Sequence, residues 1–160
     1  MKAELVDFGY AAGWQGVRLL PEPAANAAFR ALADQAWRRR GSGVRQLERN
    51  LKRILPDASS SELAALSRDA MRSYLRYWCE TFRLPTWSRD EVVERMTVHN
   101  EERIFDYRAR GRGLIAALGH FGNWDHCGAW ATAKGLPLTT VAPADRKGEA
   151  YFPHEFFYRI

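Results

Sequence analysis

Apolar residues recur at helical spacing through the first half of the chain. Residues 7–20 carry such a pattern, and Pro21 ends it because proline cannot continue a helix. Pro23 suits the first turn of a second helix, which we expect to run to about Arg40, where the sequence Gly-Ser-Gly (41–43) breaks it. A third, shorter helix is predicted over residues 44–55, ended by Pro56. The chain therefore begins as a series of short amphipathic helices.

The longest predicted helix follows a capping box, in which Ser59 precedes Glu62 by three residues. Its apolar positions form one stripe, which is more typical of a packed core than of a ligand cage. The stripe consists of Leu63, Leu66, Ala70, Met71, Tyr74, Leu75, Trp78 and Phe82. Pro85 ends this helix, a second capping box (Ser88 and Glu91) opens a short one, and residues 99–110 predict a polar helix.

The pattern changes at Gly113, where a continuous apolar run begins. The run "LIAAL" (114–118) is typical of a strand buried on both faces of a parallel sheet. A helix is predicted over residues 124–134, stopped by Gly135, and "LPLTTVA" (136–142) predicts a second strand. The expected fold class is α/β: a helical N-terminal part leading into a largely parallel sheet flanked by helices, incomplete in these 160 residues.

Composition and charge narrow the class of protein. A hydrophobic fraction of 46% fits a globular chain, and the separated Cys79 and Cys127 argue against a disulfide scaffold. We expect neither a signal peptide nor a membrane span. Residues 1–55 hold 10 Lys and Arg against 5 Asp and Glu, whereas the remainder is balanced at 14 of each. This excess is either a solvated basic face or a surface that attracts phosphate in lipid or nucleic acid. The basic residues at its centre are Arg38, Arg39, Arg40, Arg45, Arg49, Lys52 and Arg53.

The candidate chemistry lies in the turn "GHFGNWDHC" (119–127) after the first predicted strand. His120 stands at the carboxyl end of that strand, where ligands bind in open α/β sheets, and Asp125 is near enough to orient its imidazole. His120 is thus a candidate general base, although a purely structural capping histidine is the alternative. Asn123 or Asp125 can cap the helix that follows.

Other chemistries fit this turn less well. The chain has no Gly-x-Ser-x-Gly elbow for a serine nucleophile. Cys127 beside His126 suggests a thiol nucleophile, but an inert thiol buried in the helix is the commoner case. A metal site is disfavoured because residues 125–127 point in different directions from a helix.

The segment "HFGNWD" (120–125) matches the H-x-x-x-x-D signature of the glycerolipid and lysophospholipid acyltransferase superfamily. The longer segment "GRGLIAALGHFGNWDHCGAWATAKGLPLTTVA" resembles the lipid A lauroyl/myristoyl acyltransferase branch. The segments "GWQGVRLLPEP", "AWRRRGSGVRQLERNLKRILP" and "MRSYLRYWCETFRLP" resemble its actinobacterial members, the phosphatidylinositol mannoside acyltransferases. The resemblance covers about residues 7–142.

This resemblance implies a single acyltransferase domain over residues 1–160. Residues 1–110 are its helical, basic, membrane-facing part, and residues 111–160 begin the α/β core. The implied reaction moves a long-chain, palmitoyl-like acyl group from acyl-CoA to a mannose hydroxyl of a phosphatidylinositol mannoside. The implied catalytic residues are His120 and Asp125, and the implied substrate-binding residues are Gly122, Asn123, Trp124 and Arg146. Acyl-CoA is a donor substrate, and neither a cofactor nor a metal is expected.

The same resemblance implies partners and a location. The partners are acyl-CoA, phosphatidylinositol mannoside and an anionic membrane surface, but not nucleic acid, and the protein is peripheral on the cytoplasmic face of the plasma membrane. The family's chains are about twice as long, and their sheet and an additional glutamate lie in the other half. Residues 143–160 also depart from the family pattern, and Pro153 would break the helix expected there. The alternative is a non-catalytic, basic, membrane-binding fragment.

Overall fold

The computed structural model of the 160-residue chain describes residues 13–117, 119 and 121–139. The chain divides into two compact units, residues 1–83 and 84–160, which are described separately. The first unit contains helical residues 13–19 and the helices α2 (Glu22–Arg38), α3 (Ser42–Ile54) and α4 (Ser60–Arg83). The second contains a short 3₁₀ helix (Leu84–Thr86), α5 (Arg89–Glu94), α6 (Glu102–Ala109) and α7 (Trp124–Ala133).

The helix ends follow the predicted local signals. Pro23 lies in the first turn of α2. Ser59 and Glu62 exchange the two hydrogen bonds of a capping box: the Ser59 amide donates to Glu62 Oε2 at 2.8 Å, and the Glu62 amide donates to Ser59 Oγ at 3.3 Å. Ser88 and Glu91 form the second box, with matching distances of 2.7 and 3.2 Å. The predicted helices over residues 22–134 are confirmed to within a few residues at each end.

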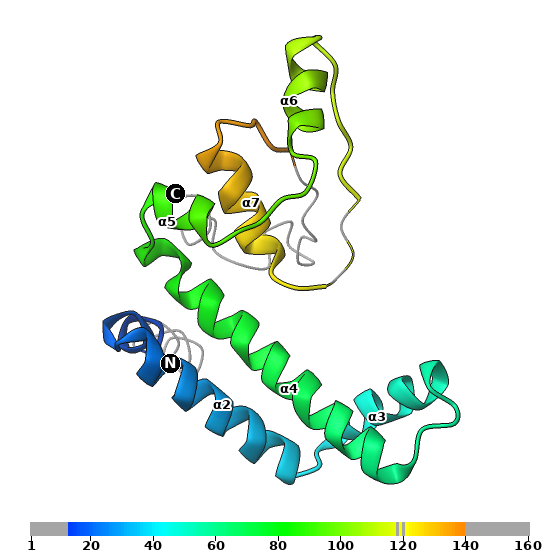
Figure 1. Cartoon of the computed structure of the whole chain (residues 1–160). Helices are drawn as coiled ribbons and strands as arrows, with labels where there is room; N and C mark the ends of the chain where they lie inside the picture. The colour runs from blue at the N-terminus through cyan, green and yellow to red at the C-terminus, as the bar shows by residue number, and fades with distance from the viewer. Residues whose placement is uncertain (1–12, 118, 120, 140–160) are drawn as a thin grey trace, which may run out of the picture. The chain divides into compact units, whose positions relative to one another are not determined.

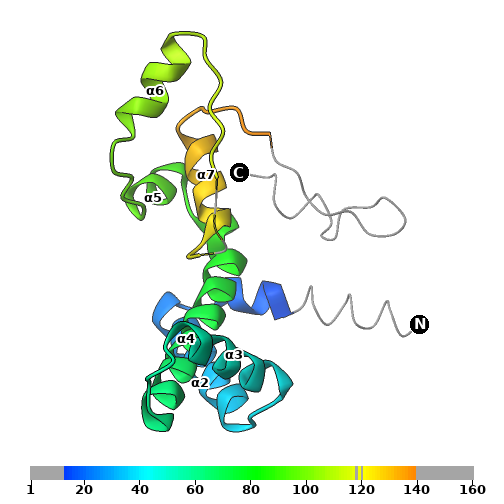
Figure 2. The ribbon, with the colours of Figure 1, turned by 90° about the vertical axis from the view of Figure 1, so that its right-hand side faces the viewer.

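The core of the first unit lies between α2 and α4, which run antiparallel and side by side (Figures 1 and 2). Ala25 and Phe29 of α2 and Cys79 of α4 are buried there, with Leu75, Trp78 and Phe82 packed around them. The rings of Phe29 and Phe82 meet edge to face, with centroids 6.1 Å apart. The aromatic stripe of α4 is thus partly a core stripe. The helix α3 packs beside α4, and Val44 is its buried residue.

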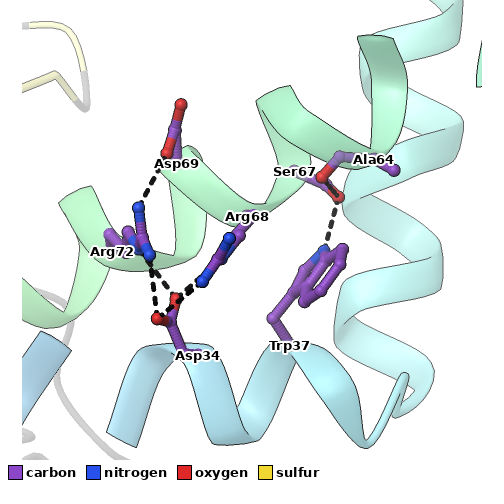
Figure 3. Close-up of polar contacts among 7 residues, drawn as sticks. All are labelled: Asp34, Trp37, Ala64, Ser67, Arg68, Asp69 and Arg72. Atoms are coloured by element: carbon purple, nitrogen blue, oxygen red, sulfur yellow. Dashed lines mark hydrogen bonds and ion pairs between the residues drawn. The ribbon is translucent and has the colours of Figure 1, made fainter. Parts of the chain in front are cut away.

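Polar contacts hold the other end of the α2–α4 pair (Figure 3). Asp34 of α2 accepts hydrogen bonds from Arg68 at 3.0 Å and from Arg72 at 2.7 Å, both on α4. These two guanidinium groups, Arg72 first, lower the pKa of the Asp34 carboxyl far below its usual range. Beside this cluster, Trp37 Nε1 donates to Ser67 Oγ at 2.9 Å, which satisfies a fully buried serine.

The second unit has its own core, built around α5 and α7. Leu84, Val92 of α5 and four residues of α7 are buried together. The four are Ala129, Trp130, Ala131 and Ala133. Half-buried Trp87, Met96 and Ile104 pack against them, so the segments before and after α5 also contribute to this core.

The predicted parallel sheet is wrong for the described part of the chain. Residues 112–117 and 136–139 form no strand, and the rest of the two expected strands, residues 118 and 140–142, lies outside the described residues. Ile115 is 96% exposed and Leu114 is 53% exposed, which is the opposite of a strand buried on both faces. A parallel strand needs backbone hydrogen bonds from neighbouring strands. No such neighbour is present among the described residues, so an apolar run alone does not make a strand here.

Candidate functional site

Residues 121–123, within the "HFGNWD" segment, lead into the N-terminus of α7. Gly122 adopts φ +65°, the left-handed region that glycine enters without steric cost, and the chain turns there into the helix. Asn123 is the N-cap residue, and its side-chain oxygen accepts a hydrogen bond from the backbone amide of His126 at 3.0 Å. The predicted cap is therefore confirmed, with Asn123 rather than Asp125 as the capping residue.

Two of the predicted site residues occupy the first turn of α7. Asp125 is partly exposed near the helix N-terminus, where the helix dipole favours a negative charge. Trp124 begins the helix and is 36% exposed. His120 and Arg146 lie outside the described residues, so the pairing of His120 with Asp125 and the role of Arg146 stay predictions.

His126 has a structural place in this turn. Its Nε2 lies 2.8 Å from the backbone carbonyl oxygen of Val92 in α5, a residue that is fully buried. Because a carbonyl only accepts, the ring donates through Nε2–H. The imidazole also meets the ring of Trp87 edge to face at 5.2 Å, and Arg95 covers that same ring at 4.6 Å. His126 therefore ties the first turn of α7 to α5.

The thiol and metal alternatives can be compared with this geometry. Cys127 is partly buried, and burial raises the pKa of its thiol, so it remains protonated at neutral pH. Activated nucleophilic cysteines have the opposite shift. Among the described residues, which include Asp125, His126 and Cys127 but not His120, no group of three or more His, Cys, Asp or Glu side chains could hold a metal ion.

The far end of α7 is held by contacts that sequence reasoning missed. Arg89 Nε donates to the carbonyl oxygen of Ala133 at 2.6 Å, and Arg108 donates to that of Gly135. Lys134 pairs with Glu101 at 3.4 Å. The two arginines satisfy carbonyls at and just beyond the C-terminus of α7, whereas Lys134 meets a carboxylate. Arg89 and Arg108 lie 44 and 27 residues from their acceptors, so no local sequence signal could have indicated the pairing.

The predicted basic segment lies on the surface of the first unit. All seven of its Lys and Arg residues are exposed. Arg40, in the turn before α3, pairs with Glu48 at 2.6 Å. In the part of the chain that the structure describes, no helix is long and apolar enough to cross a membrane.

The comparisons with known proteins identify the class. The family model described as "Bacterial lipid A biosynthesis acyltransferase" matches residues 1–151, so the chain belongs to this family. A protein of Mycolicibacterium smegmatis (strain ATCC 700084 / mc(2)155) named phosphatidylinositol mannoside acyltransferase is 40% identical over 139 residues. That alignment covers 87% of this chain and 45% of the relative.

A second relative of the same name supports this placement. The phosphatidylinositol mannoside acyltransferase of Mycobacterium tuberculosis (strain CDC 1551 / Oshkosh) is 37% identical over 138 residues, which cover 85% of this chain and 43% of the relative. The chain thus spans somewhat under half the length of these curated relatives. No solved structure matches the chain.

Proposed function

We propose that this chain carries the catalytic motif of an O-acyltransferase that moves a long-chain, palmitoyl-like acyl group from acyl-CoA to a mannose hydroxyl of a phosphatidylinositol mannoside. The family and the names of the two relatives support the reaction class and the acceptor. The observation that supports the proposal for the site is the position of Asp125, which lies in the first turn of α7 directly after the Asn123 cap.

The proposed reaction needs one base and no covalent enzyme intermediate. His120 takes the proton of the mannose hydroxyl, and the oxygen attacks the thioester carbonyl of acyl-CoA. The tetrahedral intermediate collapses by breaking the C–S bond, which leaves an O-acyl ester and the CoA thiolate, and His120 returns the proton to that sulfur. Asp125 orients the imidazole and stabilises its positive charge. The raised pKa of the Cys127 thiol fits this direct route better than a thiol acyl-enzyme.

The residues around the base have proposed substrate-binding roles. Gly122 has no side chain, so the backbone of the turn lets the substrate approach closely. Asn123 uses its side-chain oxygen for the helix cap, so its proposed contribution is to hold the turn in shape beside the substrate. Exposed Trp124 offers an apolar surface to the substrate, and Arg146 supplies a positive charge for phosphate.

The proposed location is the cytoplasmic face of the plasma membrane, with the protein bound peripherally. The exposed basic residues of the first unit support this proposal, because clustered cations on amphipathic helices bind anionic headgroups. The same residues also fit the second candidate, a non-catalytic basic membrane-binding fragment, because cations bind anionic headgroups whether or not His120 acts as a base.

The decisive experiment is transfer of labelled palmitoyl from palmitoyl-CoA to a phosphatidylinositol mannoside by the purified chain. We expect product from the wild type and from the control His99→Ala, which alters an exposed histidine. We expect His120→Ala to lose at least about 10²-fold in rate, since a general base contributes about 10²–10⁴-fold. Circular dichroism checks that all three proteins fold.

Three outcomes separate the candidates. Product lost only in His120→Ala supports the proposed base. Equal rates for His120→Ala and His99→Ala would rule out His120 as the base. No product from the wild type, together with binding to anionic vesicles, would favour the non-catalytic fragment.

A further inference from the structure

The helix α3 has one basic face directed to solvent. Its opposite side carries buried Val44 and half-buried Leu47 and Leu51, which define the side packed in the first unit. Arg45, Arg49 and Lys52 recur at intervals of four and three residues, so they share the outer side, with Arg53 next to them. All four cations are exposed. We call this set the α3 cationic stripe.

In the described part of the chain, the α3 cationic stripe makes its hydrogen bonds to neutral groups. Arg45 donates to the carbonyl oxygen of Arg40 at 2.5 Å and Lys52 to that of Ala58 at 2.8 Å, while Arg49 donates to the side-chain oxygen of Gln46. All three acceptors are neutral. Within the described ranges, no carboxylate lies in ion-pair distance of the stripe.

The one acid of α3 is directed elsewhere. Glu48 is only 18% exposed, pairs with Arg40 and accepts a hydrogen bond from Ser67 Oγ of α4 at 3.2 Å. It therefore lies toward α4, away from the stripe. The four cations of the stripe thus form no ion pair among the described residues, although the charge of Lys52 also acts on Glu62, and they can meet an anionic partner.

Exposed apolar residues continue the stripe at its C-terminal end. Ile54 is 74% exposed and Leu55 is 42% exposed, although both are large aliphatic side chains that folding normally buries. Together with Leu66 of α4, which is 40% exposed, they line a shallow groove. We call Ile54 and Leu55 the apolar tip.

Two acids border the same groove. Asp57 is exposed, and Glu62 accepts hydrogen bonds from Ser59, which together with the nearby charge of Lys52 lower the pKa of its carboxyl. Residues 38–66 nevertheless hold seven Lys and Arg residues against three acids, Glu48, Asp57 and Glu62. The region is therefore strongly cationic, and its apolar tip lies directly after Lys52 and Arg53.

We infer that the α3 cationic stripe and the apolar tip form the docking surface for an anionic lipid bilayer. The stripe contacts lipid phosphates, and Ile54 and Leu55 enter the boundary between headgroups and acyl chains, where exposed apolar side chains flanked by cations are stable. Nucleic acid would attract the same cations, but its phosphate backbone offers no apolar layer to Ile54 and Leu55. The inference rests on the membrane part of the proposed function and gives it a location in the first unit.

The test is sedimentation of the full chain with vesicles of phosphatidylcholine alone or with a third of phosphatidylglycerol. One variant combines Arg49→Gln with Lys52→Gln, and its control combines Arg30→Gln with Arg76→Gln, which remove two exposed charges from α2 and α4. A second variant combines Ile54→Ser with Leu55→Ser, and its control combines Leu19→Ser with Leu32→Ser, also exposed leucines of the first unit.

We expect the wild type to bind only the anionic vesicles. Each basic residue near such a surface contributes about a fivefold factor, so the stripe variant should bind about 25-fold more weakly, with the loss diminishing at high salt. The tip variant should weaken binding at low and high salt alike, because its contribution is apolar. Both controls should stay within about twofold of wild type if the surface is specific.

Several results would overturn the inference. The wild type could fail to bind anionic vesicles, or the tip variant could bind them as tightly as the wild type. The controls could lose as much vesicle binding as the variants. The tip variant could also change only the association of two copies of the chain and not vesicle binding. A stripe that binds duplex DNA as tightly as vesicles, with no effect of the tip, would point to a general polyanion site instead. Acyl transfer is measured separately on detergent-dispersed acceptor, so failure of the docking surface and failure of the proposed enzyme are distinguishable.

Discussion

Asp34 receives two guanidinium groups, which hold the pKa of its carboxyl well below the usual range (Figure 3). Its side chain is 13% exposed, and Arg68 and Arg72 approach both of its oxygens. Because the two donors favour the charged form, the pKa of the Asp34 carboxyl in the folded protein lies below the value of about 3.9 expected for an aspartate in an unfolded chain. The ion cluster therefore stabilises the folded first unit whenever Asp34 is ionised.

The sign of the pH dependence follows from that depressed pKa. The stabilisation is fully present above the unfolded pKa of about 3.9 and is lost as pH falls toward the folded pKa. We expect Asp34→Asn to lower the free energy of unfolding at pH 7, and the difference from wild type to shrink steadily below pH 4. Urea unfolding at several pH values, followed by circular dichroism, measures this difference.

Asp69→Asn is the matched control for Asp34. Asp69 also contacts Arg72, at 3.5 Å, but its side chain is 72% exposed, so solvent screens the interaction. We expect this control to change stability by no more than about 0.5 kcal/mol. If Asp34→Asn and Asp69→Asn had equal effects at pH 7, the cluster would not be the source of the stability.

Local sequence patterns predicted the role of Asn123 but not the contacts of Asp34 and His126. Asn123 could be predicted as a cap because its acceptor role depends only on the next three residues. Asp34 meets Arg68 and Arg72 across 34 and 38 residues, and nothing in the local pattern selects that pairing. From sequence, His126 was considered only as the neighbour of a possible Cys127 nucleophile and as part of a disfavoured metal site. Its contact with the Val92 carbonyl depends on how α5 packs against α7, which no local pattern indicates.

At the scale of elements, the described helices were predictable and the strands were not. Helix limits depend on residues within one turn, such as the boxes at Ser59 and Ser88 and the positive-φ Gly135 after α7. A strand depends on partners distant in the sequence, so the apolar run at 114–117 carried no information on whether a partner was present. The prediction of a sheet failed at that non-local step.

The link between α5 and α7 should be measurable through His126. His126→Ala leaves the buried carbonyl of Val92 without its donor, and a buried group left unsatisfied costs about 1–3 kcal/mol. We expect a destabilisation of that size in chemical denaturation followed by tryptophan fluorescence, because Trp87 and Trp130 report on this core. The exposed His99→Ala serves as the control and should change little. Equal stability of the two variants would contradict the linking role.

At the scale of the whole molecule, family and fold class were predicted with different success. The family follows from short words such as "HFGNWD" and from segments spread over most of the chain, and the family model confirms it over residues 1–151. The fold class required knowing how segments pair in space, and there the described residues are helical rather than a parallel sheet. Motifs therefore identify this chain independently of whether its elements were interpreted correctly.

The two separate cores predict how the molecule opens. Phe29 is buried with Ala25 and Cys79 in the first unit, and Val92 is buried with Leu84 and the α7 residues in the second. Phe29→Ala should cost about 3–5 kcal/mol, and Val92→Ala about 2 kcal/mol for two lost methyl groups and their cavity.

Native-state hydrogen exchange with peptide resolution measures where this loss falls. Because cooperative opening follows local contact density, Phe29→Ala should lower protection first in α2 and α4, and Val92→Ala first in α5 and α7. The two variants control for each other, since each leaves the other core unchanged. An equal loss of protection along the whole chain in both variants would mean that residues 1–83 and 84–160 unfold as one cooperative body, despite having separate cores.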